Sequence, residues 1–310
     1  MVESTKKAKE FCSLDQRKSA LEGELPKKDY LIDFMCQNAE TLFQPKTIKK
    51  SDDWLACHEE KGQTFQGFKD SKTRNKTSKE RNTIYLYIVD EMIDDDFKQM
   101  LLAYCKAFYH GMQVNLMEPK IQGDFMGRHQ IPSRINQYTG MIQYDAGAIL
   151  TKTIPMIPKS AYCMLTVTLQ DLYPRPSWNF VFGLANLQER TGVFSFVRYD
   201  PLFQGIETPD RDKILKRNAC GVMVHEIGHM FGIKHCTYYE CTMNGSNSYE
   251  ESTRAIRFLC PVCTKKLKLA IGFDTKERLV KLKEACEIIG FSENVEFYNN
   301  LLLQFESKQV

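Results

Sequence analysis

The feature that most constrains this chain is the segment 225–263, which carries two sets of metal-binding side chains in a short stretch. The first set is His225, His229 and His235, and the second is Cys236, Cys241, Cys260 and Cys263. Three histidines leave one position of a tetrahedral zinc ion open for chemistry, whereas four thiolates fill all four positions. The segment therefore predicts an enzyme whose catalytic metal lies beside a structural metal.

The histidines have the spacing of one helical face followed by a turn. His225 and His229 are four residues apart, so both imidazoles can reach the same ion. Glu226 follows the first ligand and can act as the base that takes a proton from water. Gly232 can end the helix in a left-handed conformation, so that the chain turns back and presents His235. A chance HExxH on an ordinary helix is the alternative, but the glycine and the third histidine argue against it.

The cysteines form two short-loop pairs, and 18 residues separate the pairs. The CxxC spacing of the second pair is typical of zinc knuckles, and the wider first pair can reach the same tetrahedral ion. Disulfide bonds are an alternative, but they need an oxidising compartment. Redox-active or unpaired thiols are another. We expect a structural zinc ion at this site.

His235 and Cys236 are neighbours, yet we assign them to different metals. In an extended segment successive side chains point to opposite sides, so His235 can bind one metal while Cys236 binds the other. Six nearby cations either offset the negative charge of the four-thiolate site or form a solvated basic face. They are Lys234, Arg254, Arg257, Lys265, Lys266 and Lys268.

The whole motif, HExxHxxGxxHC-x4-CxM-x16-CxxC, resembles the archaemetzincin family of metzincin zinc peptidases, and most closely its vertebrate members. The resemblance continues upstream through residues 171–174, 177–183 and 192–196, and covers roughly residues 83–272. It implies a metzincin fold, a catalytic zinc on the three histidines, Glu226 as general base and a second zinc on the four cysteines. It also implies that Met243 forms the methionine turn beneath the catalytic metal, where an ordinary core methionine is the alternative.

The order of the expected elements indicates an α+β fold, in which a twisted mixed sheet is backed by helices and accompanied by a small zinc-stapled C-terminal subdomain. Runs of β-branched and aromatic residues predict strands at 83–89, 113–116, 163–169, 179–185 and 193–199. Helical periodicity predicts helices at 28–43, 94–110, 140–153 and 276–305, besides the active-site helix that begins near Cys220.

We divide the chain into three parts on this basis. Residues 1–82 form an N-terminal extension, which ends in a polar surface loop or linker at 59–82 and shows no recognisable chemistry. Residues 83–235 form an N-terminal subdomain with the active-site helix. Residues 236–310 form a C-terminal subdomain with the cysteine site and the methionine turn.

The expected strand at 179–185 suggests a place for substrate. If this strand lies at the sheet edge, its free backbone groups face the cleft, and an extended peptide can pair with them as a further strand. A covered edge without a ligand is the alternative. The expected substrate-binding residues are Asn179, Phe180, Val181, Phe182 and Gly183.

The bulk composition limits the partners and the compartment. A net charge of only +3, with 26% charged residues, does not indicate a nucleic-acid-binding protein. The sequence has no run of 18 apolar residues, as a membrane span needs, and its first twenty residues lack the apolar core of a secretory signal. Seven of the 11 cysteines show no framework spacing, which fits a reducing interior. We therefore expect a cytoplasmic or nuclear protein that is not secreted.

These observations predict a zinc metallopeptidase, with two zinc ions per chain, that acts on peptides or proteins and needs no partner chain. The resemblance also allows aminopeptidase-like action on short peptides, and Tyr238, Tyr239 and Tyr249 are candidates for stabilising the oxyanion. The first alternative is a catalytically weak, zinc-stapled module that binds peptides or proteins, against which the intact Glu226 argues. The second is a nucleic-acid-binding zinc finger, against which the near-neutral charge argues.

Overall fold

The computed structural model describes residues 10–308 except 73 and 122, so part of the segment tested above for a secretory signal, residues 1–9, lies outside the described residues. The chain folds around a five-stranded mixed sheet with strand order β2-β1-β5-β8-β7. The strands are β1 (Thr83–Ile88), β2 (Gln113–Met117), β5 (Ala161–Thr168), β7 (Gly183–Asn186) and β8 (Thr191–Ser195). The first four in spatial order are parallel, and β7 runs antiparallel at the edge.

Helices cover both faces of this sheet. Alternate residues of β1 point to opposite sides, so Ile84 and Leu86 join one hydrophobic cluster while Tyr87 joins another. The first cluster includes α6 (Asp95–Phe108) and the central helix α9 (Arg211–Met230); the second includes α7 (Phe125–Arg128) and α8 (Ala146–Thr153). The expected α+β architecture, a mixed sheet backed by helices, is confirmed. No helix in the described part of the chain is both long and apolar enough to cross a membrane.

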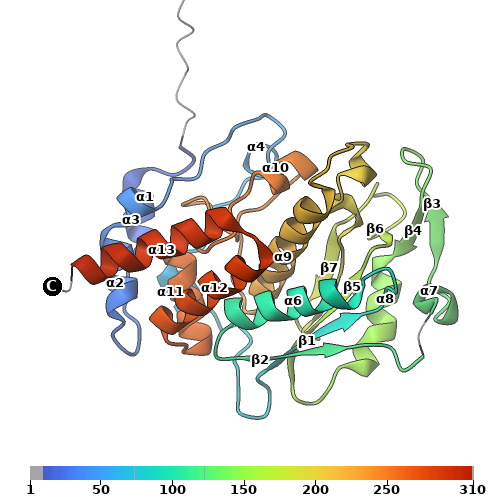
Figure 1. Ribbon diagram of the computed structural model, residues 1–310, viewed down its shortest axis with the longest axis horizontal. Helices are drawn as coiled ribbons and strands as arrows, with labels where there is room; N and C mark the ends of the chain where they lie inside the picture. The colour runs from blue at the N-terminus through green and yellow to red at the C-terminus, as the bar shows by residue number, and fades with distance from the viewer. Residues whose placement is uncertain (1–9, 73, 122, 309–310) are drawn as a thin grey trace, which may run out of the picture.

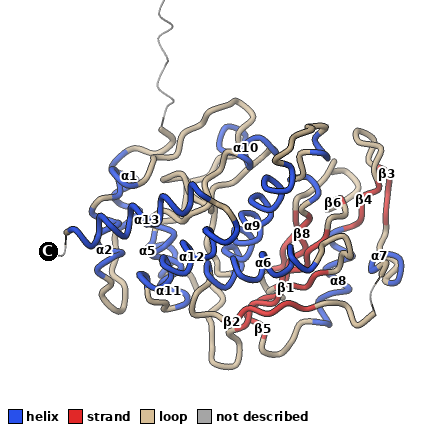
Figure 2. The backbone as a smooth tube through the Cα atoms, viewed as in Figure 1, coloured by secondary structure: helices blue, strands red, loops and turns tan. Residues whose placement is uncertain are grey.

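The helices of the two chain ends pack together at the side of α9 remote from the sheet (Figure 1). From the N-terminus they are α1 (Leu14–Leu21), α2 (Tyr30–Gln37), α3 (Ala39–Leu42), α4 (Trp54–Cys57) and α5 (Phe65–Lys69). From the C-terminal part they are α10 (Tyr249–Thr253), α11 (Pro261–Ile271), α12 (Thr275–Ile289) and α13 (Ser292–Ser307). Figure 2 shows helices and loops at this end, with the strands grouped at the other end.

The N-terminal residues belong to this packing. Phe65 and Phe68 of α5 are fully buried, and α5 contacts α11. The prediction of a surface loop at 59–82 is therefore wrong where α5 forms. The two aromatic side chains of α5 are buried, and the helix packs beside α11. The helix expected at 28–43 is divided at Asn38 into α2 and α3. The boundaries of the three proposed domains stay a prediction.

Two further expectations are corrected by local capping. Residues 140–153 form the strand β4 (Ile142–Asp145) followed by α8, because the side chain of Asp145 accepts a hydrogen bond from Ala148 N and starts the helix there. The helix expected at 276–305 is two helices, α12 and α13, since Gly290 adopts a left-handed conformation with φ 81° and ends α12.

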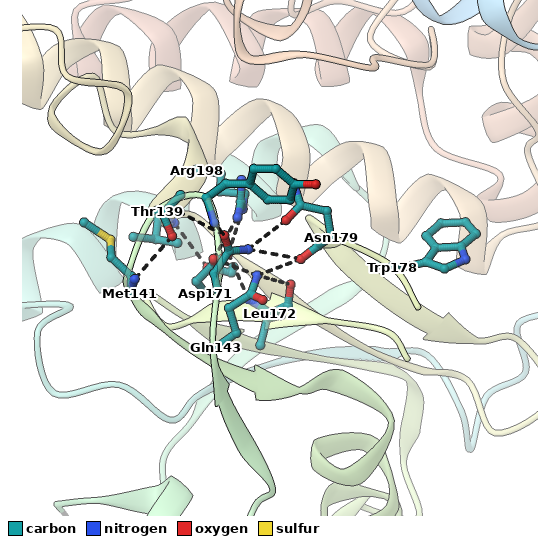
Figure 3. A network of polar contacts seen from close by, with 12 residues as sticks. Thr139, Met141, Gln143, Asp171, Leu172, Trp178, Asn179 and Arg198 are labelled. Carbon is teal, nitrogen blue, oxygen red and sulfur yellow. Dashed lines mark hydrogen bonds and ion pairs between the residues drawn. The ribbon is translucent and has the colours of Figure 1, made fainter. Parts of the chain in front are cut away.

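The hairpin beside the cleft is shorter than expected, with β7 at 183–186 and β8 at 191–195 in place of 179–185 and 193–199. Before β7 the chain is held by side chains: Asn179 O accepts hydrogen bonds from Arg134, Asn136 and Gln143 (Figure 3). After β8 the chain turns into the short 3-10 helix η2 (Val197–Tyr199). Side-chain contacts from distant residues therefore hold the chain at Asn179. Backbone hydrogen bonds from Val181 N to Leu172 O and from Ser195 N to Phe182 O continue towards β7.

A small second sheet supports that segment. Its order is β3-β4-β6, with β3 (Ser133–Ile135) and β6 (Asp171–Tyr173) on either side of β4. An isolated bridge joins Leu172 of β6 to Val181. The remaining 3-10 helices are η1 (Ile154–Met156) and η3 (Leu202–Gln204).

Candidate metal centres

The last turns of α9 bring the first two histidines together. His225 and His229 lie on one face, and their Nε2 atoms are 3.0 Å apart. The helix ends when Gly232 takes φ 81°, with Ile233 N donating to Gly228 O. The chain then turns back and brings His235 to within 5.4 Å of the first imidazole, measured between ring centroids. The turn at Gly232 therefore works as the sequence predicts.

The histidine geometry is compatible with a zinc ion. One ring nitrogen from each histidine lies within 4.8 Å of the others, and a regular tetrahedron with zinc–nitrogen bonds of ~2.05 Å has its nitrogens about 3.3 Å apart. The outward Nδ1 atoms contact acceptors: Thr242 O at 2.8 Å, Ile233 O at 2.7 Å and Glu60 Oε1 at 2.8 Å. Since Nδ1 is the donor in each contact, the three Nε2 lone pairs converge. Burial also lowers the pKa of His229 to about 4, which favours the neutral ligand form.

Glu60 is a partner of the site that sequence reasoning missed. Its Oε1 accepts hydrogen bonds from His235 Nδ1 and, at 3.0 Å, from Trp54 Nε1. Burial is the largest influence and acts to raise its pKa, but the hydrogen bonds from His235 and Trp54 and the nearby imidazoles together lower it. Glu60 lies 175 residues from the histidine it contacts. Glu60 and the exposed Glu59 are neighbours in a polar stretch of the sequence, so the sequence gives no sign that one of them contacts a histidine and the other does not.

Glu226 lines the same cavity, which has a volume of about 240 Å³. Burial raises the pKa of its carboxyl group to about 8. The carboxylate has no hydrogen-bond or ion-pair partner among the described residues, so it is free to interact with a ligand in the cavity. Met243 packs beneath α9, because a Cβ built on Gly228 would lie 2.6 Å from its sulfur.

The cysteine set is a closed, buried cluster. The four sulfur atoms lie within 4.8 Å of one another, and those of Cys236 and Cys260 are 3.6 Å apart. A tetrahedral zinc with four bonds of ~2.3 Å places its sulfurs about 3.8 Å apart, whereas a disulfide needs about 2.05 Å. The backbone N–H groups of Met243 and Cys260 point to the sulfur of Cys241, at 3.5 and 3.3 Å. The cluster is therefore compatible with zinc and not with a disulfide.

The nearby cations take several different roles. Lys266 is fully buried, donates to Gln63 O, and its charge helps to lower the pKa of Cys236, after hydrogen bonds from the other thiols. Lys268 pairs with Asp29 and Arg254 pairs with Asp53. Of these three cations, Lys266 therefore affects the charge of the cysteine cluster, whereas Lys268 and Arg254 are paired with aspartates.

His235 and Cys236 point into the two different centres. His235 lines the cavity, while Cys236 lies among the buried sulfurs. The loop that follows them is held by the N-terminal chain, since Lys46 N donates to Tyr238 O and Glu240 N donates to Gln44 O. Residues near 45 thus brace the loop that serves both sites.

The expected substrate residues are only partly brought to the cavity. Val181, Phe182 and Gly183 line it, but Asn179 and Phe180 do not. The carbonyl of Asn179 is occupied by the three donors described above, and the ring of Phe180 lies 3.7 Å from the guanidinium of Arg198. The candidate tyrosines Tyr238, Tyr239 and Tyr249 do not line the cavity, whereas Tyr199 does.

The comparisons with known proteins agree with this geometry. Residues 140–269 match the family described as Peptidase family M54, a range that contains all seven candidate ligands. The chain is 34% identical over 270 residues to archaemetzincin-2 of Macaca fascicularis and of Homo sapiens, covering 78% of this chain and 74% of each relative. It is 29% identical to archaemetzincin-1 of Homo sapiens, of which it covers 53%.

Two solved structures are also similar. The archaemetzincin from Methanopyrus kandleri is 24% identical with a TM-score of 0.47, and the match covers 63% of this chain and 98% of that one. A zinc-dependent peptidase from Methanocorpusculum labreanum is 23% identical with the same TM-score, covering 59% and 99%.

Proposed function

Because the chain belongs to the archaemetzincin family and is a zinc-dependent metallopeptidase, we propose that it hydrolyses peptide bonds in the cavity lined by His225, His229 and His235. The observation that carries the proposal is the convergence of three Nε2 lone pairs beside the unpartnered carboxylate of Glu226. In this proposal the three histidines hold the catalytic zinc. When bound, zinc acts as a Lewis acid that makes water a nucleophile at neutral pH.

Glu226 is the proposed general base. Its position next to His225 lets the carboxylate orient a water molecule, accept its proton and return that proton to the leaving amine. The absence of a competing partner among the described residues supports this role, since a carboxylate held in an ion pair would be a weaker base. Met243 is the proposed floor beneath the histidines, and its packing against Gly228 supports this.

The four cysteines are proposed to hold a second, structural zinc, which makes two zinc ions per chain. Their burial and the backbone donors to Cys241 support a closed thiolate site. The burial of all four cysteines, each at most 1% exposed, argues against a catalytic role.

Substrate is proposed to lie along residues 181–183, at the start of the edge strand. Val181 to Gly183 line the cavity, which supports this smaller part of the predicted binding segment. Aminopeptidase-like action on short peptides is a narrower form of the proposal. A set of peptides with free and acetylated N-termini distinguishes it from cleavage within the chain.

The proposed compartment is the cytoplasm or the nucleus. The support is chemical: none of the 11 cysteines is in a disulfide, as suits a reducing environment. Cell fractionation with an antibody against the chain tests this, and recovery from the secreted fraction would contradict it.

The deciding experiment is a peptide-library digest read by mass spectrometry, comparing the wild type with Glu226→Gln. The amide keeps the shape and removes the base, so we expect a loss of about 10²–10⁴-fold in rate with both metals retained. Equal cleavage by the variant would refute the proposed mechanism. Peptide binding without turnover by the wild type would favour the binding module instead.

A further inference from the structure

One wall of the histidine cavity is formed by the buried guanidinium group of Arg257. The residue is 5% exposed and lines the cavity with Gly221 and Val222. A Cβ built on Gly221 would lie 2.3 Å from Arg257 Nε, so the guanidinium packs directly on the helix backbone at this glycine. Gly221 is four residues before His225 on α9. The cationic group is therefore one helical turn from a candidate metal ligand, on the same face.

Arg257 has no anionic partner within the described part of the chain. Among the residues that the structure describes it makes no ion pair, and Nη2 donates only to Asn218 Oδ1 at 3.0 Å and to Ser252 O at 2.7 Å. Nε has no acceptor although it is fully enclosed. Nη1 also makes no hydrogen bond within the described chain, so it remains available to a ligand in the cavity.

Two other arginines nearby show the usual arrangement. Arg198 is also buried and forms two hydrogen bonds to Asp171, at 2.7 and 2.8 Å (Figure 3). Arg254 pairs with Asp53. A buried cation without an anion is costly, because it loses hydration without a compensating charge. Arg257 is thus the exception among these three, and it is the one that lines the cavity.

The surroundings of Arg257 favour an incoming anion. Burial lowers the pKa of Arg257 to about 10, and the charge of Arg217, a second cation, adds to this effect, so Arg257 stays charged at neutral pH. Glu226 is the one carboxylate of the described residues that lines the cavity, and it does not pair with Arg257. A planar guanidinium group recognises carboxylates through paired, charge-assisted hydrogen bonds.

We infer that Arg257 binds a carboxylate of the peptide substrate, in the part of the cavity one helical turn from His225, and so sets specificity. The carboxylate comes either from an acidic side chain or from the free C-terminus of a short peptide. This inference rests on the proposed function, because it assigns a substrate class to the same cavity.

Four matched peptides separate the two sources. They share one sequence and differ only in having Glu or Gln at one internal position and a free or amidated C-terminus. We expect the wild type to show kcat/KM about 10- to 100-fold higher for the peptides with the recognised carboxylate, the range typical of a hydrogen bond to a charged group. Glu at several positions is scanned to find the one recognised. Equal kcat/KM for all four peptides at every position would overturn the inference.

Arg257→Gln tests the residue itself. We expect the preference to fall to near unity, and Arg257→Lys to restore part of it because the charge returns. Arg254→Gln is the matched control, since that arginine is paired with Asp53 and lies outside the cavity lining; its preference should match the wild type. A uniform loss on all four peptides in Arg257→Gln would mean a purely structural role and would refute the inference. If this variant does not fold, the wild-type peptide series decides alone.

A binding measurement distinguishes failure of this inference from failure of the proposed peptidase function. If no peptide is cleaved, calorimetric titration of the zinc-loaded wild type with the same four peptides measures binding directly. Tighter binding of the carboxylate peptides would uphold the inference without turnover, and equal binding would refute it.

Discussion

The two candidate metal centres share one peptide bond, between His235 and Cys236, yet they are built in opposite ways. The four cysteines are at most 1% exposed and come from a loop and the start of α11, all within residues 236–263. The three histidines are partly exposed, and their cavity also takes Trp54, residues 181–183, Tyr199 and Arg257. The cysteine cluster is therefore buried like part of the core. The histidine site, in contrast, is a cavity lined by side chains from distant parts of the chain.

This difference indicates which site the fold depends on. Removing one ligand from a buried thiolate cluster leaves three charged or unpaired sulfurs in the core, while the histidines keep their outward hydrogen bonds without a metal. The cysteine centre should therefore act on stability and the histidine centre on activity.

The largest expected effect comes from comparing Cys236→Ala with His235→Ala. The cysteine change should lose the structural zinc and cost about 4 kcal/mol or more, lowering Tm by roughly 10 °C or preventing folding. The histidine change should weaken only the catalytic zinc and keep the fold. Differential scanning fluorimetry with zinc quantification checks both. If both variants melt alike and lose both metals, the two ligand sets form one cooperative unit.

Chelation should separate the centres in time. Protein purified under reducing conditions should contain two zinc ions per chain. A mild chelator should then remove the zinc at the histidines first, because an open site exchanges ligands more readily than four buried thiolates. Activity should disappear before the circular dichroism signal changes. Simultaneous loss of activity and structure would contradict the division between an open and a closed site.

A smaller effect is expected from Glu60→Gln, which sharpens the comparison by testing the outer support of the histidine site. The amide weakens the hydrogen bond that orients His235, and such partners typically contribute about 10- to 100-fold in metal affinity. Competition with a fluorescent zinc chelator measures this. The exposed neighbour provides the control, Glu59→Gln, which should bind zinc like the wild type. Loss of the cysteine-bound zinc in Glu60→Gln would show that the two sites are coupled through this residue.

Local spacing explains how much of the site could be predicted. His225 and His229 are one turn apart on any helix, and Gly232 takes a left-handed conformation that glycine adopts without steric cost. The four cysteines lie close enough in sequence for one ion. By contrast, Glu60 and Arg257 are ordinary charged residues in sequence. Only packing brings Glu60 to His235 and leaves Arg257 without an anion in the part of the chain that the structure describes.

The fold shows the same division. The mixed sheet and its helical cover were predictable from the strand and helix patterns, whereas the strand order comes from the structure. The break between β4 and α8 and the short β7 were not, because each depends on particular polar contacts. The donors to Asn179 O come from residues 36 to 45 positions away. Hydrophobic periodicity within a segment carries no information on contacts at that separation.

The sequence alone determined the two candidate ligand sets, the helix and turn that present the histidines, and the membership of a zinc peptidase family, because these depend on spacings within a few residues. The tertiary structure decided which groups surround the open site. It brought the carboxylate of Glu60 to His235, buried Arg257 in the cavity wall, and left Glu226 without a partner among the described residues. Those positions follow from the packing of distant segments, where burial and the presence or absence of a counter-charge are set by the whole fold.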